Sequence, residues 1–167
     1  FDVTTPVSEG FGKGFETFIG GLDWMFLNNV ASDKPDPIGY APTIPHQVFM
    51  VYQMMFAIIT PALISGAIVE RVTFKTYFWF VLLWSTFIYS PLAHWVWGRG
   101  WMGAMGALDF AGGTVVHISS GVSVVVAAWV IGPRKDHLNK PHTPHNVPYV
   151  LLGIGLLWFG WFGFNVM

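Results

Sequence analysis

The chain has 167 residues, of which 53% are hydrophobic and 17% aromatic, while only 10% are charged. Soluble domains carry about 25% charged residues, so the composition excludes an ordinary soluble protein and indicates a polytopic membrane protein. A net charge of −1 without a basic stripe argues against nucleic-acid binding, and the absence of cysteine excludes disulfides and thiolate metal sites.

Residues 1–46 are mixed in character and predict a connection outside the membrane. Within them, the stretch FGKGFETFIGGLDWMFLNNV predicts a short amphipathic or interfacial helix around Phe15–Leu27. The next stretch, ASDKPDPIGYAPTIP, predicts a loop because proline, aspartate and glycine dominate it. The chain therefore reaches the membrane only after this region.

Four long apolar segments follow and predict four transmembrane helices. Each is roughly 20 residues long, the length that an α-helix needs to cross a hydrocarbon core of about 30 Å. Their expected limits are residues 47–69, 76–97, 113–132 and 147–167. Pro61 interrupts the hydrogen bonds of the first segment and predicts a kink or a looser turn there. The predicted fold class is an all-α membrane helix bundle.

The positive charges of the loops predict how the helices are oriented. Loops 70–75 and 133–146 lie on one side and contain Arg71, Lys75, Arg134, Lys135 and Lys140. The positive-inside bias places these two loops in the cytoplasm, and it places residues 1–46 and loop 98–112 outside the cell. The abrupt beginning at Phe1 and end at Met167 predict a fragment of a longer multi-pass protein of the cell membrane.

A titratable side chain, His117, lies deep in the third apolar segment, within DFAGGTVVHISSG. It follows Asp109 by eight residues, which places it about 12 Å deeper along a helix. Ionisable groups at such depth usually face a protein interior or a water-lined path. Two interpretations stay open for His117: a hydrogen bond to a neighbouring helix, or a place in a permeation or proton path. Haem ligation is weaker, because no second mid-membrane histidine exists.

Several other polar and aromatic residues have both a structural and a functional interpretation. Asp109 can cap the N–H groups of the third helix, and it can also give the outer mouth a negative potential that favours a cation. Trp97 belongs to a group of interfacial tryptophans, and an indole face also binds cations well. Core packing is the default for Phe56 and Phe164. His137, His142 and His145 have no strong metal-binding spacing, so no metal or cofactor is expected.

Five motifs across residues 47–165 resemble the ammonium transporter family (Amt/Mep/Rh), and in particular its Amt branch. They are FAIITPALISGAIVERVTF, PLAHWVWGRGW, ALDFAGGTVVHISSG, the IGPRK turn and PHNVPYVLLGIGLLWFGWFGFN. The resemblance implies an eleven-helix subunit with inverted repeats, a homotrimer and a cytoplasmic regulatory protein as partner. This chain would supply helices three to six, and loop 133–146 would join the two halves.

The resemblance also implies a substrate site and a pore. At the matching positions, Trp97 would recruit ammonium at the outer mouth, Asp109 would support that site, and Tyr52 would border it. Phe56 and Phe164 would be stacked rings that close the pore, and His117 would be the first of two pore histidines. The implied function is transport of ammonium or ammonia, with deprotonation outside and a proton relay through histidine.

Two departures from the family pattern limit what this chain can do by itself. The serine that follows GFN in the family is absent, because the chain ends GFNVM, and no second pore histidine is present. We therefore expect no transport by this chain alone. The alternatives are an ammonium sensor coupled to signalling, an Rh-type gas channel, a membrane enzyme or redox protein that uses His117, and a non-transporting scaffold. Of these, an enzyme is disfavoured.

Overall fold

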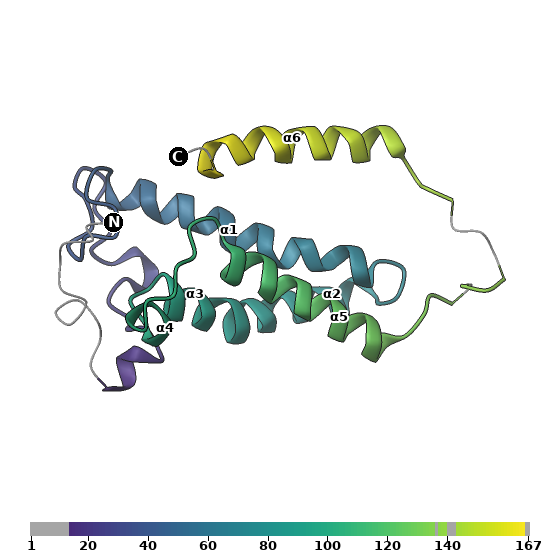
Figure 1. Cartoon of the computed structure of the whole chain (residues 1–167), viewed down its shortest axis with the longest axis horizontal. Coiled ribbons are helices and arrows are strands. Elements are labelled where there is room, and N and C mark those ends of the chain that lie inside the picture. Colours follow the sequence, from purple (N-terminus) through teal and green to yellow (C-terminus); the bar gives the residue numbers. More distant parts are fainter. Residues whose placement is uncertain (1–13, 136, 140–142, 166–167) are drawn as a thin grey trace.

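The computed structural model describes residues 14–135, 137–139 and 143–165, and all regular elements among them are helical. Two short 3-10 turns come first: η1 (Gly14–Thr17) and η2 (Met25–Leu27). They are followed by α1 (His46–Ile68), α2 (Phe74–Trp84), the π-helix η3 (Ser85–Tyr89) and α3 (Ser90–Val96). The last elements are α4 (Trp101–Ala104), the π-helix η4 (Gly113–Ile118), α5 (Ser119–Ile131) and α6 (Val147–Asn165) (Figure 1).

Three helical stretches of the described residues are long and apolar enough to cross a membrane. They are His46–Ile68, Gly113–Ile131 and Val147–Asn165, and each begins and ends within two residues of a predicted segment. The second predicted segment, residues 76–97, is helical from Phe74 to Val96, but its hydrogen bonds widen to the π pattern in η3. The residues at both joints, Ser85 and Ser90, keep right-handed helical dihedral angles, so the helical path continues through η3.

The N-terminal region does not form the continuous helix expected around Phe15–Leu27. Only the short turns η1 and η2 are present there. Gly20 and Gly21 separate the two turns, and Phe26 and Leu27 have positive φ angles of 56° and 63°. Left-handed dihedral angles cannot continue a right-handed helix, so this segment forms two separate turns.

The first long helix, α1, passes through Pro61 without an interruption in its assignment. Proline lacks an N–H group and so removes one bond of the helical ladder. In the preceding turn, the hydroxyl of Thr60 donates to the carbonyl oxygen of Phe56 at 2.6 Å. The side chain of Thr60 is fully buried, so α1 is tightly packed where its backbone ladder is incomplete.

The buried core joins α1 to the two π-helices and their neighbours. It consists of Ile64, Trp84, Tyr89, Val96 and Val115. Helices α1 and α5 lie side by side (Figure 1). The π-helix η3, which lies between α2 and α3, also contacts α1. Helix α6 has no buried residue and lies beyond α1 in Figure 1. The core is therefore built from α1 to α5.

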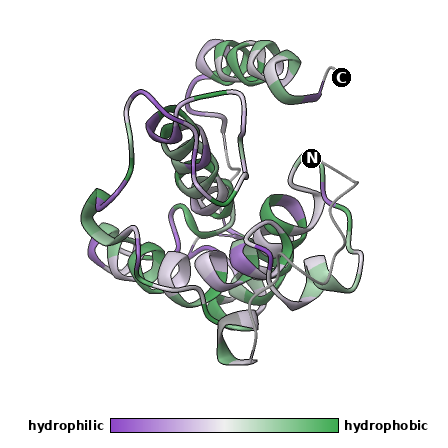
Figure 2. Ribbon diagram, turned by 90° about the vertical axis from the view of Figure 1, so that its left-hand side faces the viewer, coloured by the Kyte–Doolittle hydropathy of each residue, from purple (hydrophilic) through white to green (hydrophobic). Residues whose placement is uncertain are grey.

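Large apolar side chains also cover the outside of the helices. Trp129 of α5 is 84% exposed and Phe159 of α6 is 79% exposed. Figure 2 shows hydrophobic residues in green along the long helices. A helix that is hydrophobic around its whole circumference suits burial in a membrane or in a larger bundle. These surfaces therefore fit lipid and further helices.

Candidate pore site

The carboxylate of Asp109 closes the beginning of η4. Its Oδ1 accepts hydrogen bonds from the N–H groups of Gly112 (2.7 Å) and Gly113 (2.8 Å). Its Oδ2 accepts from the N–H groups of Thr114 (2.8 Å) and Val115 (3.0 Å). These are N–H groups at a helix start, which have no partner within the helix. The structure therefore gives Asp109 the capping role, with both oxygens occupied by backbone.

Glycine is required at position 112 by the turn between Asp109 and η4. The φ angle of Gly112 is +84°, and a Cβ atom there would lie 2.8 Å from Cγ2 of Val116. The carbonyl oxygen of Gly112 accepts from the N–H groups of both Val116 and His117 at 2.9 Å. The bond to His117 has the five-residue spacing of a π-helix. The position of His117 around the helix axis therefore depends on this turn.

Trp97 is bound to the same turn. It lies at the carboxyl end of α3, and its indole Nε1 donates to the backbone carbonyl oxygen of Asp109 at 2.8 Å. Asp109 thus holds η4 through its carboxylate and Trp97 through its main chain. The structure brings these two predicted residues together and fixes the orientation of the indole ring.

Four aromatic rings form a continuous group around Phe56. The Phe56 ring lies 5.9 Å from the Trp97 ring, 5.6 Å from the Phe164 ring and 5.0 Å from the Tyr52 ring, centre to centre. Phe56 and Tyr52 belong to α1, Phe164 to α6, and Trp97 follows α3. The sequence therefore singled out residues that the fold places in one group, which we call the aromatic row.

The geometry within the aromatic row differs from the stacked pair that the resemblance implied. The planes of Phe56 and Phe164 are perpendicular, at 89°, and so meet edge to face. This arrangement is favourable, because the positive edge of one ring meets the negative face of the other.

His117 stands apart from the aromatic row. Its side chain is exposed on the surface formed by the described residues, and no ring contact joins it to them there. Its carbonyl oxygen accepts a 3.3 Å hydrogen bond from the hydroxyl of Ser120. This bond fixes the backbone at His117, while its imidazole is exposed on the part of the chain that the structure describes.

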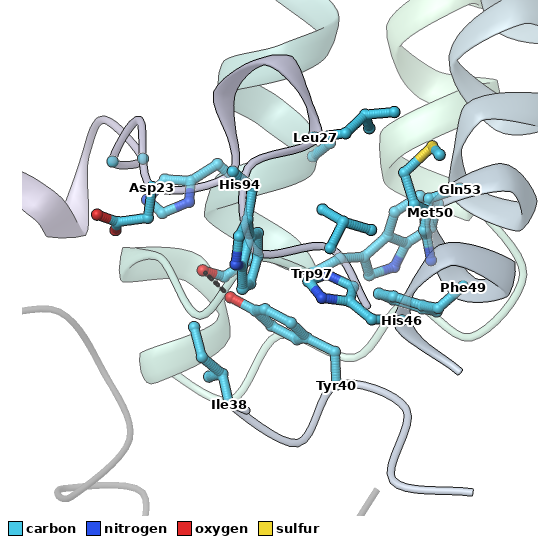
Figure 3. Close-up of a pocket in the computed structure, with 16 residues that line it drawn as sticks. Asp23, Leu27, Ile38, Tyr40, His46, Phe49, Met50, Gln53, His94 and Trp97 are labelled. Carbon is cyan, nitrogen blue, oxygen red and sulfur yellow. Dashed lines mark hydrogen bonds between the residues drawn. The ribbon is translucent and has the colours of Figure 1, made fainter. Parts of the chain in front are cut away.

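A cavity of about 450 Å³ lies beside Trp97 (Figure 3). Three parts of the chain line it: the segment 20–40, the first two turns of α1, and the carboxyl end of α3. Its polar and aromatic lining includes Trp24, Tyr40, His46, His94 and Trp97. The sequence had indicated only Trp97 among these residues. The repeated spacing of residues 46, 49, 53 and 56 along one face of α1 is the signal that links this cavity to the aromatic row.

A second aspartate, Asp36, fixes the loop that covers this cavity. Its Oδ1 accepts from the N–H groups of Ile38, Gly39 and Tyr40, and its Oδ2 accepts from the N–H group of Ala41, all within 3.0 Å. Burial raises the pKa of this carboxyl, but the four backbone donors stabilise its charge and bring the pKa below the ordinary value. The charged form therefore holds the loop.

Acid should loosen this loop. The folded pKa of Asp36 is lowered, so its stabilisation is complete above about pH 4 and is lost as the pH falls through the folded pKa. Hydrogen exchange of the amides of residues 38–41, corrected for intrinsic rates, should rise between about pH 5 and 2.5. In the Asp36→Asn variant, the same amides should exchange rapidly both at about pH 5 and at about pH 2.5. Unchanged protection of the natural loop across this range would contradict the prediction.

Comparison with known proteins shows the family to which this chain is similar. Residues 10–167 match the family described as Ammonium Transporter Family. The chain is 55% identical to an ammonium transporter of Bacillus subtilis over 150 residues, which are 90% of this chain and 36% of that protein. It is 44% identical to ammonium transporter Amt1 of Archaeoglobus fulgidus, over 95% of this chain and 37% of that protein.

A solved structure has the same fold. The Mep2 mutant delta442 from Candida albicans superposes with a TM-score of 0.72 at 36% identity, over 93% of this chain and 36% of that one. The chain thus spans little more than a third of the length of these relatives. The helical fold, the apolar helices and the matched residues lead to one conclusion. The chain is part of a multi-pass membrane protein and belongs to the ammonium transporter family.

Proposed function

We propose that the protein containing this chain transports ammonium or ammonia across a membrane, and that residues 47–165 form one wall of its pore. The observation that carries this proposal is the aromatic row, in which Phe56 of α1 contacts both Trp97, which follows α3, and Phe164 of α6. Membership of the family supports it, since the relatives named above are ammonium transporters.

In this mechanism the aromatic row selects ammonium over potassium because ammonium can lose a proton. Ammonium and potassium ions are similar in size and charge, so size alone does not distinguish them. The face of Trp97 attracts a cation at the outer mouth. The perpendicular rings of Phe56 and Phe164 oppose the passage of any hydrated ion. Ammonium can lose a proton and continue as ammonia, whereas potassium cannot.

His117 would then accept or relay the proton that ammonium leaves behind. Its exposed imidazole lies one helix turn beyond the capped start of η4, where a second wall of the pore could cover it. Asp109 supports the outer site by holding η4 and Trp97 in place, while its carboxylate oxygens remain bonded to backbone. In this role it contributes negative charge near the mouth without contacting the ion.

The assembly and orientation are part of the same proposal. Loops 70–75 and 133–146 face the cytoplasm, and loop 98–112 faces the exterior. Two arginines on the proposed cytoplasmic side bind neighbouring groups. Arg71 Nη1 donates a hydrogen bond to the carbonyl oxygen of Gly132 at 3.0 Å. Arg134 forms an ion pair with the carboxylate of Glu70 at 3.4 Å. Three subunits and a cytoplasmic regulatory protein complete the proposed assembly.

Replacing Trp97 with Leu in the full-length transporter tests the proposed outer site. The loss of a cation–π contact of about 1.4 kcal/mol should raise the ammonium concentration for half-maximal current about tenfold. Currents across proteoliposomes would measure it, with potassium as the reference cation. Trp129→Leu is the matched control, because Trp129 is 84% exposed on α5 and lies outside the aromatic row. Absence of ammonium transport by the natural full-length protein would overturn the proposed function.

A further inference from the structure

The turn that carries His117 combines two hydrogen-bond patterns at its start. The carbonyl oxygen of Gly112 accepts from the N–H group of Val116, at the α-helical spacing, and from that of His117, at the π spacing, both at 2.9 Å. The two spacings differ by one residue, which is about 100° around the axis of an α-helix. The direction of the His117 side chain therefore depends on the register of η4.

The end of η4 changes the hydrogen bonding of Val115. In an α-helix, the carbonyl oxygen of Val115 would accept from the N–H group of Ser119, four residues later. In this structure that N–H group donates instead to the carbonyl oxygens of Thr114 and Val116. The π register therefore takes from the Val115 carbonyl the backbone donor that an α-helix would give it. Because an unmade hydrogen bond is costly in a buried segment, this carbonyl needs another donor.

The side chain of Ser119 supplies this donor. Its hydroxyl donates to the carbonyl oxygen of Val115 at 2.6 Å and lies 3.1 Å from that of Val116. Both Ser119 and Val115 are buried. Serine hydroxyls often bond to a carbonyl three or four residues earlier in a helix. Ser119 differs from the ordinary case because its acceptor does not receive the N–H group of the same residue, so the hydroxyl replaces a backbone bond.

The chain is held on both sides of this turn by tryptophans of other segments. After the turn, Nε1 of Trp84 donates to the hydroxyl of Ser123 at 2.8 Å, and that hydroxyl donates to the carbonyl oxygen of Ser119 at 2.7 Å. Before the turn, the indole of Trp97 donates to the carbonyl oxygen of Asp109. A change in register is therefore confined to the segment between them, which contains His117.

From these contacts we infer that Ser119 is a positioning residue for His117. Its hydroxyl holds η4 in the π register and so keeps the imidazole where it takes up the proton of ammonium, without contacting the substrate itself. When the hydroxyl is removed, the Val115 carbonyl loses its donor, and the turn shifts toward the α spacing that Gly112 and Val116 already have. This inference rests on the proposed function, and it deepens it by naming the residue that fixes the relay histidine.

Substitutions of Ser119 in the full-length transporter test this role. In Ser119→Ala the maximal ammonium current should fall about tenfold, because a buried carbonyl loses its hydrogen bond. The half-maximal ammonium concentration should stay unchanged, because Asp109 holds Trp97 without Ser119. Ser119→Thr should restore the current, since a threonine hydroxyl can make the same bond. Ser65→Ala is the matched control, because the Ser65 hydroxyl donates to the carbonyl oxygen of Ala62 at 2.6 Å within α1.

A double substitution separates positioning from a general loss of stability. In a His117→Ala background, Ser119→Ala should not alter the entry of neutral ammonia, which a pH-sensitive dye inside the vesicles measures, because no imidazole remains to be positioned. A further loss of that signal would overturn the inference. Equal maximal currents in Ser119→Ala and the natural protein would overturn it as well.

The structure of the full-length Ser119→Ala variant provides a test that does not depend on transport. We expect the hydrogen bond from the N–H group of His117 to the carbonyl oxygen of Gly112 to be lost and the imidazole to be displaced. An unchanged π turn with His117 in its present place would contradict the role of Ser119. If the natural protein conducts ammonium and these tests fail, only that role is wrong. If the natural protein conducts none, the proposed function fails first.

Discussion

Replacing His117 with Ala in the full-length transporter should abolish the ammonium-dependent current. The proposed mechanism removes a proton from ammonium at the outer mouth and moves it along a path separate from the apolar route of ammonia. Histidine is the side chain best suited to this relay, because its imidazole can accept a proton at one ring nitrogen and release one from the other. Alanine has no group that can do so, and we expect the current to fall at least a hundredfold, since general acid–base steps contribute about that much or more.

The measurement is the current through proteoliposomes after a rapid ammonium jump, at matched protein density. His145→Ala is the control, because His145 lies exposed in the loop before α6 and has no place in the proposed path. A current in the His117→Ala variant equal to that of the control would remove His117 from the mechanism. The aromatic row and the membership of the family would be unaffected by that result.

A second readout separates proton movement from movement of ammonia. If the His117→Ala variant still admits neutral ammonia, a pH-sensitive dye inside the vesicles should report alkalinisation while the current is absent. A variant that loses both signals has a blocked pore. A comparison of the two signals therefore distinguishes a relay role for His117 from a role in keeping the pore open.

The sequence predicted the long helices well, because their signal is local. Apolar runs of roughly 20 residues set the limits of α1, of η4 and α5 together, and of α6, and loss of hydrophobicity at their ends is visible without any tertiary information. It predicted the capping role of Asp109 for the same reason, since a carboxylate just before a helix start meets free N–H groups. Such features depend on neighbours within a few residues.

The features that the sequence missed depend on contacts between distant parts of the chain. The two π-helices change the register of α-helical runs by one residue, and no residue type marks such a change reliably. The cavity needs Trp24 and His46 to meet the end of α3, whereas the sequence predicted only a short interfacial helix around Phe15–Leu27 and a loop after it. The positive φ angles of Phe26 and Leu27, which prevent a continuous helix over Phe15–Leu27, likewise had no signal in the residue types.

Asp109→Asn should be the most destabilising polar substitution in this part of the protein. The carboxylate accepts four backbone hydrogen bonds, whereas an asparagine side chain offers one oxygen and turns an NH₂ group toward the other pair of donors. Two N–H groups at the start of η4 would then lose their acceptor. Hydrogen bonds to a charged group are worth about 1.5–3 kcal/mol each, so we expect a loss of about 3 kcal/mol or more in the free energy of unfolding.

Function should fall together with stability in this variant, because the turn of Asp109 holds both Trp97 and His117. The indole of Trp97 donates to the carbonyl oxygen of Asp109, and the carbonyl oxygen of Gly112 accepts from the N–H group of His117. Thermal unfolding of the purified full-length protein in detergent would measure the first effect, and the half-maximal ammonium concentration the second. Asp36→Asn is the matched control for thermal unfolding, since Asp36 also accepts four backbone hydrogen bonds but lies in a loop outside the bundle. If both variants unfold at the same temperature, the carboxylate of Asp109 does not stabilise the helix bundle more than the carboxylate of Asp36 does. That result would contradict the proposal that Asp109 supports the site around Trp97.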